Sequence, residues 1–479
     1  MFVGRQHYFR ALGAELEKVR TGGEGDFVLV RGRRQVGKSR MLTEFLATND
    51  APFVYYQATR KTPEQELLAF TETVAASTLA CADQVRAGLV FKGWGAAFAL
   101  IARTADRRRS PIVVIDELPY LMDGDPDFEA TLQKAWDHDL ERSPVLLIVV
   151  GSDLAMMRAL VTYGRPLYGR PRRELTVAPL SPREVGELRG LSAEDALDAY
   201  LVTGGFPLVA LSWPRGANLA GFVSDAFADP ASPLVVVGER MVNAELPGDL
   251  NARAVLTAIG AGERAFTQIA NAAGFGGTSL HRALTTLKRK DVIARDVPMS
   301  AMPQKKSDRI RIADPYLRFW LRFVEPSLPD VERGRADLAT ARFWGSWDSY
   351  RGRAIEPVVR DAIERILPDA RFGAARVVGG YWTRANDPEV DLVGVADASA
   401  IERVEFAGSI RWRERKKFGI SDARDLAAVR PRIPGAGVDT RLVAVSRTGF
   451  EVDVTRGKLV DVRLGPREVV AAFAHQVPR

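Results

Sequence analysis

The sequence predicts an α/β fold built from several domains, and three observations lead to that prediction. The first is a strand, a glycine-containing loop and a helix near the start of the chain, and the second is an apolar strand that ends in two acids. The third is the length of 479 residues, which exceeds one typical core and favours two to four domains. A hydrophobic content of 46% with 27% charged residues is typical of a folded protein.

Charge, cysteine content and apolar runs exclude several classes of protein. The formal net charge of +7 permits a polyanionic partner without requiring one. Cys81 is the single cysteine, which leaves no internal disulfide and favours a reducing compartment. The first residues lack a secretory leader, and the run VLLIVV is about a third of a membrane span. We therefore expect a cytoplasmic protein with no membrane contact.

The strongest motif follows the first predicted strand. FVLVRGRRQVGKSRMLTEFL reads as strand, loop and helix, and its loop matches G-x-x-x-x-G-K-[ST]. Glycines let the backbone curl so that successive N–H groups face a phosphate, and the start of the helix favours negative charge. Lys38 would reach the β- and γ-phosphates, and the Ser39 hydroxyl would bind Mg²⁺. The predicted nucleotide-binding residues of this segment are Gly32, Arg33, Arg34, Gln35, Val36, Gly37, Lys38, Ser39 and Arg40.

A phosphate-binding loop predicts a second strand whose end carries an acid. SPIVVIDELPYL supplies it, with residues 112–115 as the buried strand and Asp116 and Glu117 at its carboxyl end. Asp116 would hold Mg²⁺, and Glu117 would orient the attacking water. Together with the loop, these acids predict ATP and Mg²⁺ as ligands and ATP hydrolysis as the reaction.

Polar residues after the next strand are further candidates for catalysis. The strand PVLLIVVGSD ends in Ser152, which would either sense the γ-phosphate or cap the helix that follows. The loop YGRPLYGRPRREL then holds Arg165 and Arg170. A guanidinium near the γ-phosphate neutralises charge that develops during phosphoryl transfer. Arg170 is the better candidate of the two for this role, which it would fill either in its own chain or in trans. The alternative is a solvated basic loop.

Six motifs in the first half resemble the archaeal-type ATPases, which belong with the AAA-like signal-transduction ATPases with numerous domains (STAND). They are MFVGR, GRRQVGKS, IVVIDELPYL, VVGSDLAMM, PLYGRP and LVTGGFPLV, in the order that the family uses. The resemblance implies that Val3, Gly4 and Arg5 contact the nucleotide. It also implies that TGGFP, residues 203–207, lies in a helical lid near the nucleotide.

A basic helical module is predicted after a proline-rich stretch. Residues 251–297 read as three helices and a strand, and RIRIAD supplies a second strand beyond the basic turn PQKKSD. This pattern predicts a winged helix, with DNA as a candidate partner. A protein-contact or relay role is the alternative. The basic face of the third helix would consist of His281, Arg282, Lys288, Arg289 and Lys290.

The last part of the chain contains the acids of a nuclease site but lacks the usual lysine. By the same resemblance, IADPYLRFWLRFVEPSL opens an uncharacterised domain of the family, whose end is related to restriction-endonuclease-like folds. Glu356 on a helix, then Asp391 and Glu405 on successive strands, are the candidate metal ligands. The lysine position is Ala407, and Arg411 cannot give up a proton to act as a base. We expect a vestigial site with little cleavage, and a sheet with solvated acids is the alternative.

The predicted architecture is therefore an α/β, P-loop NTPase parallel-sheet core with further domains behind it. The predicted function is an ATP-driven conformational switch that acts on nucleic acid through the winged helix. The alternatives are an ATP-gated nuclease and a non-hydrolysing nucleotide sensor that scaffolds protein partners, and the sequence is compatible with an oligomer. The predicted domains are an ATPase core at 1–175, a helical lid at 176–245, a winged helix-turn-helix at 246–315, a helical linker at 316–345 and a nuclease-like α/β domain at 346–479.

Overall fold

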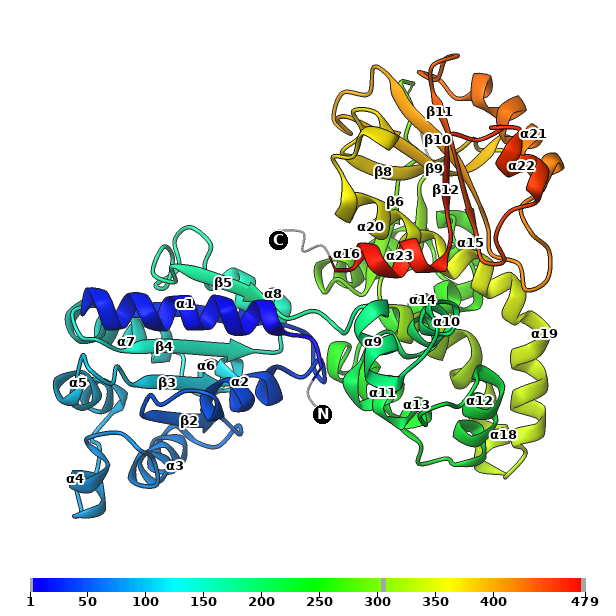
Figure 1. The fold of residues 1–479 in the computed structure, drawn as a ribbon. Helices are drawn as coiled ribbons and strands as arrows, with labels where there is room; N and C mark the ends of the chain where they lie inside the picture. The colour runs from blue at the N-terminus through cyan, green and yellow to red at the C-terminus, as the bar shows by residue number, and fades with distance from the viewer. Residues whose placement is uncertain (1–2, 303–306, 475–479) are drawn as a thin grey trace. The chain divides into compact units, whose positions relative to one another are not determined.

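The computed structural model describes residues 3–302 and 307–474, and the predicted α/β class is confirmed (Figure 1). Contacts divide the described residues into two compact units, the first ending at Pro179 and the second beginning at Leu180. Most of the predicted basic turn PQKKSD, residues 303–306, lies outside the described residues. No helix in the described ranges is long and apolar enough to cross a membrane.

The first unit is built on a parallel sheet with the strand order β2-β3-β4-β1-β5. Its three central strands are almost wholly buried, which explains their near-continuous apolar sequences, because helices cover both faces of such a sheet. The strands are β1 (Asp26–Arg31), β2 (Phe53–Gln57), β3 (Ile112–Asp116), β4 (Leu146–Gly151) and β5 (Arg173–Thr176). Parallel pairing brings the carboxyl ends of all five strands to one edge.

Helices connect these strands. Helix α1 packs along β1 and β4, and it presents Leu12, Leu16 and Val19 to the core (Figure 1). Helix α2 buries the apolar stripe that its 3.6-residue period predicts. The helices of this unit are α1 (Gln6–Gly22), α2 (Lys38–Ala47), α3 (Pro63–Ala75), α4 (Ala82–Arg86), α5 (Trp94–Thr104), α6 (Leu118–Gly124), α7 (Phe128–Ala135), the π-helical turn η1 (Trp136–Leu140) and α8 (Leu154–Ala159).

The helices of the predicted lid belong to the second unit. Helix α9 starts with a capping box, in which Ser181 and Glu184 satisfy each other's backbone amides. Helix α10 packs against α9 and, far along the chain, against α17 and α23. These helices are α9 (Pro182–Arg189), α10 (Ala193–Thr203), α11 (Pro207–Ser212), α12 (Leu219–Ala228) and α13 (Pro233–Glu245).

Three helices and an antiparallel hairpin follow, in the element order that a winged helix requires. Helix α16 buries Leu280, Ala283 and Leu287, while its basic residues stay mostly at the surface. In the hairpin, Ile293 pairs with Ile312. The elements are α14 (Leu250–Ala261), α15 (Phe266–Ala273), α16 (Gly277–Arg289), β6 (Ile293–Asp296) and β7 (Arg309–Ile312).

A helical segment rich in aromatic residues joins this module to the last sheet. Trp320 packs directly on Gly238 of α13, where a Cβ would lie only 2.2 Å from the indole ring. The aromatic stripe is therefore core. The elements are α17 (Pro315–Phe319), the π-helical turn η2 (Trp320–Val324), the 3₁₀ turn η3 (Glu325–Ser327), α18 (Leu328–Glu332), α19 (Ala336–Ala354) and α20 (Glu356–Ile366).

The chain ends in a mixed sheet with the strand order β12-β11-β10-β9-β8. Strand β10 runs antiparallel to β9 and parallel to β11, and a bulge interrupts its pairing between Val404 and Phe406. The strands are β8 (Val377–Trp382), β9 (Glu389–Val395), β10 (Val404–Arg411), β11 (Arg441–Ser446) and β12 (Val462–Leu464). The helical elements are η4 (Ala370–Phe372), α21 (Ile420–Val429), η5 (Arg430–Arg432), α22 (Val452–Arg456) and α23 (Pro466–Ala472).

Candidate nucleotide-binding site

The loop between β1 and α2 has the tight curl that a phosphate-binding loop needs. Gln35 and Gly37 are left-handed, with φ of 64° and 89°. Gly32 lies so close to the neighbouring backbone that a Cβ there would be 2.5 Å from the Val177 carbonyl oxygen. A side chain at position 32 would push this backbone apart, which is the physical reason for glycine at this point.

Lys38 opens α2 and lies over this loop. Its Nζ donates hydrogen bonds to the carbonyl oxygens of Gly32 at 2.8 Å and Arg33 at 3.0 Å. Burial lowers the pKa of the Lys38 ammonium, and the carboxylates of Asp116 and Glu117 oppose that shift. In such a dry setting, an ammonium attracts a phosphate more strongly than it would in water.

Ser39 and Asp116 bring two oxygen ligands together. The Ser39 hydroxyl donates a 2.7 Å hydrogen bond to Asp116 Oδ2, and the Tyr55 hydroxyl donates to the same oxygen. Asp116 Oδ1 accepts from the backbone amide of Glu117 at 2.9 Å. Carboxylate and hydroxyl oxygens suit Mg²⁺, so the donor set of Ser39 and Asp116 fits the predicted metal.

Tyr55 is a site residue that sequence reasoning missed. It lies on β2, which pairs with β3 in the register Tyr55–Val114 and Gln57–Asp116. Burial, together with the nearby Asp116 carboxylate, raises the pKa of the Tyr55 phenol, so it stays protonated and donates. The sequence does place a tyrosine near the carboxyl end of a strand, which was the available signal for a site residue. Only the sheet order shows that this strand lies beside β3 and its Asp116.

Glu117 and Ser152 follow adjacent strands and contact each other. Glu117 adopts a left-handed conformation with φ 55° and ψ 44°, and its Oε2 accepts a 2.8 Å hydrogen bond from the Ser152 hydroxyl. Helix α8 is capped by Asp153, whose carboxylate accepts from the Met156 amide at 2.9 Å. The helix-capping alternative for Ser152 is therefore wrong, because the next residue performs that role.

The start of the chain lies against the phosphate loop. Arg5 is buried and left-handed, and its guanidinium donates to the carbonyl oxygens of Val36 at 2.8 Å and Ala178 at 2.5 Å. Arg5 thus ties the loop to the end of the first unit, and a nucleotide contact by Val3, Gly4 or Arg5 stays a prediction. At the surface, Arg34 donates to the Tyr120 hydroxyl at 2.7 Å, and Arg40 lies 3.3 Å from Glu44.

The two candidate arginines are not at this site. Arg165 pairs with Glu129, and Arg170 forms a two-pronged ion pair with Asp137 at 2.8 and 2.7 Å. Arg170 precedes β5, so it lies at the amino end of a parallel sheet whose carboxyl end carries the phosphate loop. Arg170 therefore does not reach the phosphate loop of its own chain, and the prediction that it acts there is wrong. A catalytic role of Arg170 in trans stays a prediction.

Glu356 and Asp391 share a second, half-buried site in the last domain. The Asp391 carboxylate accepts from the Ile410 amide at 2.7 Å and from the Ser409 hydroxyl at 3.3 Å. Arg360 links the pair, since it donates to the Asp391 carbonyl oxygen at 2.7 Å and lies 3.3 Å from Glu356. Burial, and then the Asp391 charge, raises the pKa of Glu356 to about 7.

Glu405 does not join these two acids. Its Oε2 accepts from the Ala374 amide at 3.2 Å, in the bulge of β10, whereas Asp391 bonds Ser409 and Ile410. Glu405 and Ser409 are four residues apart on this strand, which corresponds to about 13 Å along it. In the described ranges, no group of three or more His, Cys, Asp or Glu side chains could hold a metal ion. The predicted convergence of Glu356, Asp391 and Glu405 is therefore wrong.

The lysine position of that site is also closed. Ala407 is fully buried in the core of the sheet. Arg411 forms ion pairs with Asp422 at 3.1 Å and, more loosely, with Asp391 at 3.8 Å. The geometry thus offers a fixed positive charge next to one acid, and position 407 supplies no lysine to activate water.

Comparison with known proteins agrees with this geometry. Residues 10–210 match the family described as an ATPase domain predominantly from Archaea, and residues 320–420 match archaeal and bacterial proteins of unknown function. An uncharacterized protein of Methanocaldococcus jannaschii is 23% identical over 424 residues, covering 87% of this chain and 88% of that protein.

Two archaeal proteins are among the solved structures that match this chain. The Walker-type ATPase of Pyrococcus abyssi has a TM-score of 0.47 at 19% identity, over 67% of this chain and 96% of that one. The ORC2 protein of Aeropyrum pernix, solved in ADPNP and ADP complexes, has a TM-score of 0.43 at 13% identity, over 69% and 94% of the two chains.

Proposed function

We propose that this chain, which carries a domain of the predominantly archaeal ATPase family, binds ATP with Mg²⁺ and hydrolyses it to drive a conformational switch coupled to nucleic acid. The observation that carries the proposal is the convergence of Lys38, Ser39, Asp116 and Glu117 at the carboxyl edge of one parallel sheet. A parallel α/β sheet binds ligands at this edge.

Each of these residues has a defined part in the reaction. The loop amides and Lys38 would hold the β- and γ-phosphates, and Ser39 with Asp116 would hold Mg²⁺, which supplies charge neutralisation. Glu117 would orient the attacking water and polarise it. Ser152, now bonded to Glu117 at 2.8 Å, would move its hydrogen bond to the γ-phosphate and so release Glu117 for the water.

The switch would act on the second unit as a whole. The lid helices α9–α13 belong to the same compact unit as the three-helix module and the last sheet. Asp198 on α10 forms ion pairs with Arg351 of α19 at 3.3 Å and with Arg447 at 2.9 Å, and all three side chains are largely buried. Because this network fastens the lid to the last domain, a nucleotide-dependent movement of the lid would carry both modules with it.

Nucleic acid is the proposed partner of the three-helix module. On α16, His281, Arg282, Lys288 and Arg289 are exposed, opposite the buried face of the helix. Exposed cations on the third helix of such a module make phosphate contacts that weaken with salt. A double variant, Arg282→Gln with Lys288→Gln, should weaken duplex binding and flatten its salt dependence, whereas the exposed Arg424→Gln on α21 should do neither.

ATP turnover, measured with Mg²⁺ and with or without duplex DNA, tests the proposal. Lys38→Ala should abolish ATP binding and turnover, because the ammonium that contacts the phosphates is gone. Lys92→Ala removes an exposed lysine of the same unit and serves as the matched control. If Lys38→Ala bound and hydrolysed ATP as the wild type does, the proposed site would be wrong.

A further inference from the structure

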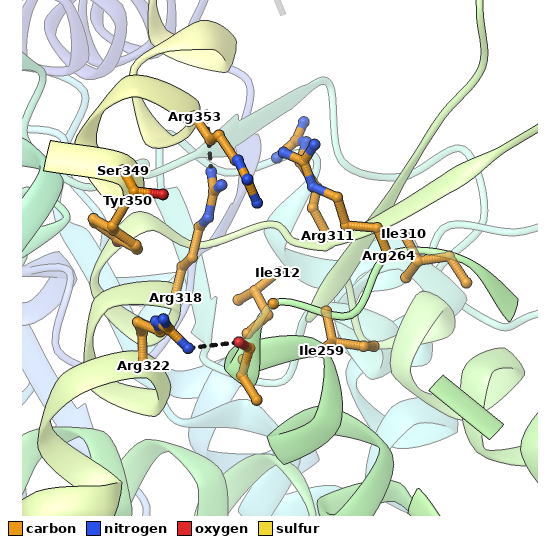
Figure 2. A pocket seen from close by; sticks show the side chains of 13 residues that line it. Ile259, Arg264, Ile310, Arg311, Ile312, Arg318, Arg322, Ser349, Tyr350 and Arg353 are labelled. Atoms are coloured by element: carbon orange, nitrogen blue, oxygen red, sulfur yellow. Dashed lines mark hydrogen bonds between the residues drawn. The ribbon is translucent and has the colours of Figure 1, made fainter. Parts of the chain in front are cut away.

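A pocket lined by five arginines lies within the second unit, outside the sites described so far (Figure 2). Its volume is about 90 Å³. An engineered cavity of roughly 150 Å³ holds benzene, so this space suits a compact group of a few heavy atoms and excludes a base or a sugar. The arginines are Arg264, Arg311, Arg318, Arg322 and Arg353.

These arginines come from separate elements that meet around one space. Arg264 lies in the loop between α14 and α15, and Arg311 lies on the hairpin strand β7. Arg318 and Arg322 follow on α17 and η2, and Arg353 lies near the end of α19. Figure 2 shows their guanidinium groups gathered around the pocket. The winged-helix-like module and the entry to the last domain therefore contribute to the same site.

The positive charge of the pocket is poorly compensated. None of the described residues that line it is acidic. Arg311 has an ion-pair partner in Asp296 at 3.0 Å, but Arg322 bonds only the Ala261 carbonyl, at 2.6 Å. The side chains of Arg264 and Arg353 donate no hydrogen bond to any residue in the described ranges. Donors at the pocket are thus left for another acceptor.

Arg318 is partly buried between other lining residues. Its guanidinium lies 3.5 Å from the carbonyl oxygen of Arg353 and over the ring of Tyr350, 5.6 Å from the ring centroid. Burial lowers the pKa of Arg264 and of Arg318, and the neighbouring guanidinium groups add to that shift. An arginine does not lose its proton in a protein, so the charges stay and repel each other. Several fixed cations, four of them partly buried and Arg353 exposed, surround a small space and form an electrostatic site for an anion.

Two acids outside the lining of the pocket, Glu356 and Asp296, act on its arginines. Asp296 pairs with Arg311, and Glu356 acts on both Arg264 and Arg318. Glu356 also pairs with Arg360 at 3.3 Å. Glu356 therefore cannot neutralise the five arginines of the pocket.

We propose that this pocket binds a phosphate group through the guanidinium groups of Arg264, Arg318 and Arg353. Planar guanidinium forks match the oxygens of a tetrahedral phosphate, which is the compact, highly charged anion that this volume admits. The phosphate belongs either to the backbone of a nucleic acid or to a small phosphorylated molecule. The site is independent of ATP hydrolysis by the first unit.

The test uses the full chain with Lys38→Ala, so that the loop after β1 cannot supply the phosphate site. Two probes are used. Binding of inorganic phosphate is measured as a shift in the melting temperature, with chloride of equal ionic strength as the reference. Binding of a labelled DNA duplex is measured at constant salt. Arg264→Gln and Arg353→Gln should each weaken binding of the responding probe about tenfold or more, as expected for loss of a charge-assisted bond. Arg424→Gln removes the same charge from the surface and should change neither probe.

The outcomes separate the two sources. If the pocket variants weaken phosphate binding but not DNA binding, the ligand is a small phosphorylated molecule. If they weaken DNA binding, the pocket holds a backbone phosphate. Arg264→Lys keeps the charge without the fork, so it should fold and still bind more weakly. The proposal fails if neither probe distinguishes Arg264→Gln, Arg264→Lys and Arg353→Gln from Arg424→Gln.

Discussion

The Ser152 hydroxyl donates a 2.8 Å hydrogen bond to Glu117 Oε2. This bond joins the ends of the neighbouring strands β3 and β4. The charge of Glu117, like that of Asp116, acts on the Lys38 ammonium. Both partners point to the edge of the sheet where a γ-phosphate would lie. The bond therefore makes the orientation of Glu117 depend on Ser152, and it suggests two measurements.

Glu117→Gln should retain ATP binding while steady-state turnover falls about a hundredfold or more, because an amide cannot polarise the attacking water. The amide is nearly the same size and can keep the Ser152 hydrogen bond, so the fold should be unaffected. ATP affinity and turnover are measured separately. Turnover equal to that of the wild type would move the catalytic role to another residue.

Ser152→Ala should lower turnover about tenfold without abolishing ATP binding, since the hydroxyl that would donate to the γ-phosphate is lost. Ser152→Thr keeps the hydroxyl and should restore much of the activity. Single-turnover kinetics with ATP and Mg²⁺ separate this effect from binding. Equal rates for Ser152→Ala and wild type would remove Ser152 from the mechanism.

Asp198→Ala should destabilise the second unit by about 3 kcal/mol, because it leaves Arg351 and Arg447 buried with Glu414 as their remaining shared acid. Scanning calorimetry should show a lower melting temperature for the transition of that unit. Asp225→Ala removes an exposed acid of α12 and is the control. A melting temperature equal to that of the control would mean that the network contributes no net stability.

Glu356→Gln should stabilise the protein at pH 8.5 more than at pH 5. The pKa of Glu356 is raised to about 7 from 4.5, so its contribution to stability is fully present below pH 4.5 and is lost as the pH rises through 7. The shift of 7 − 4.5 = 2.5 units corresponds to at most about 3 kcal/mol. Melting temperatures of both proteins at the two pH values measure this, and a pH-independent difference would contradict it.

The last domain should cleave plain duplex DNA weakly or not at all with Mg²⁺ or Mn²⁺, with or without ATP. Glu405 lies away from Asp391, and the position where a nuclease of this class needs its lysine is the buried Ala407. A nicking assay on supercoiled plasmid measures this sensitively. Robust cutting by the wild type that disappears in Asp391→Ala would show instead that the site is active.

Local sequence determined the candidate nucleotide site of this protein. The curl at Gly32 and Gly37, the lysine and serine that open α2, and the acids that end β3 depend on neighbouring residues and on strand direction alone. In a parallel sheet, the carboxyl ends of strands meet at one edge, so motifs far apart in the sequence had to converge. The α/β class followed for the same reason.

Tertiary structure alone decided the features that depend on register, sheet order and packing. The register of β9 and β10, which pairs Leu392 with Gly408, placed Glu405 away from Asp391, although both positions fit the expected order of acids. Strand direction put Arg170 at the opposite edge from Lys38, and sheet order put Tyr55 beside Asp116. The arginine pocket draws on residues from 264 to 353, and only the packing of separate helices and a hairpin brings their charges together. Contacts of this kind between distant residues leave no periodic or local pattern in a sequence, because each residue satisfies the rules of its own helix, strand or loop.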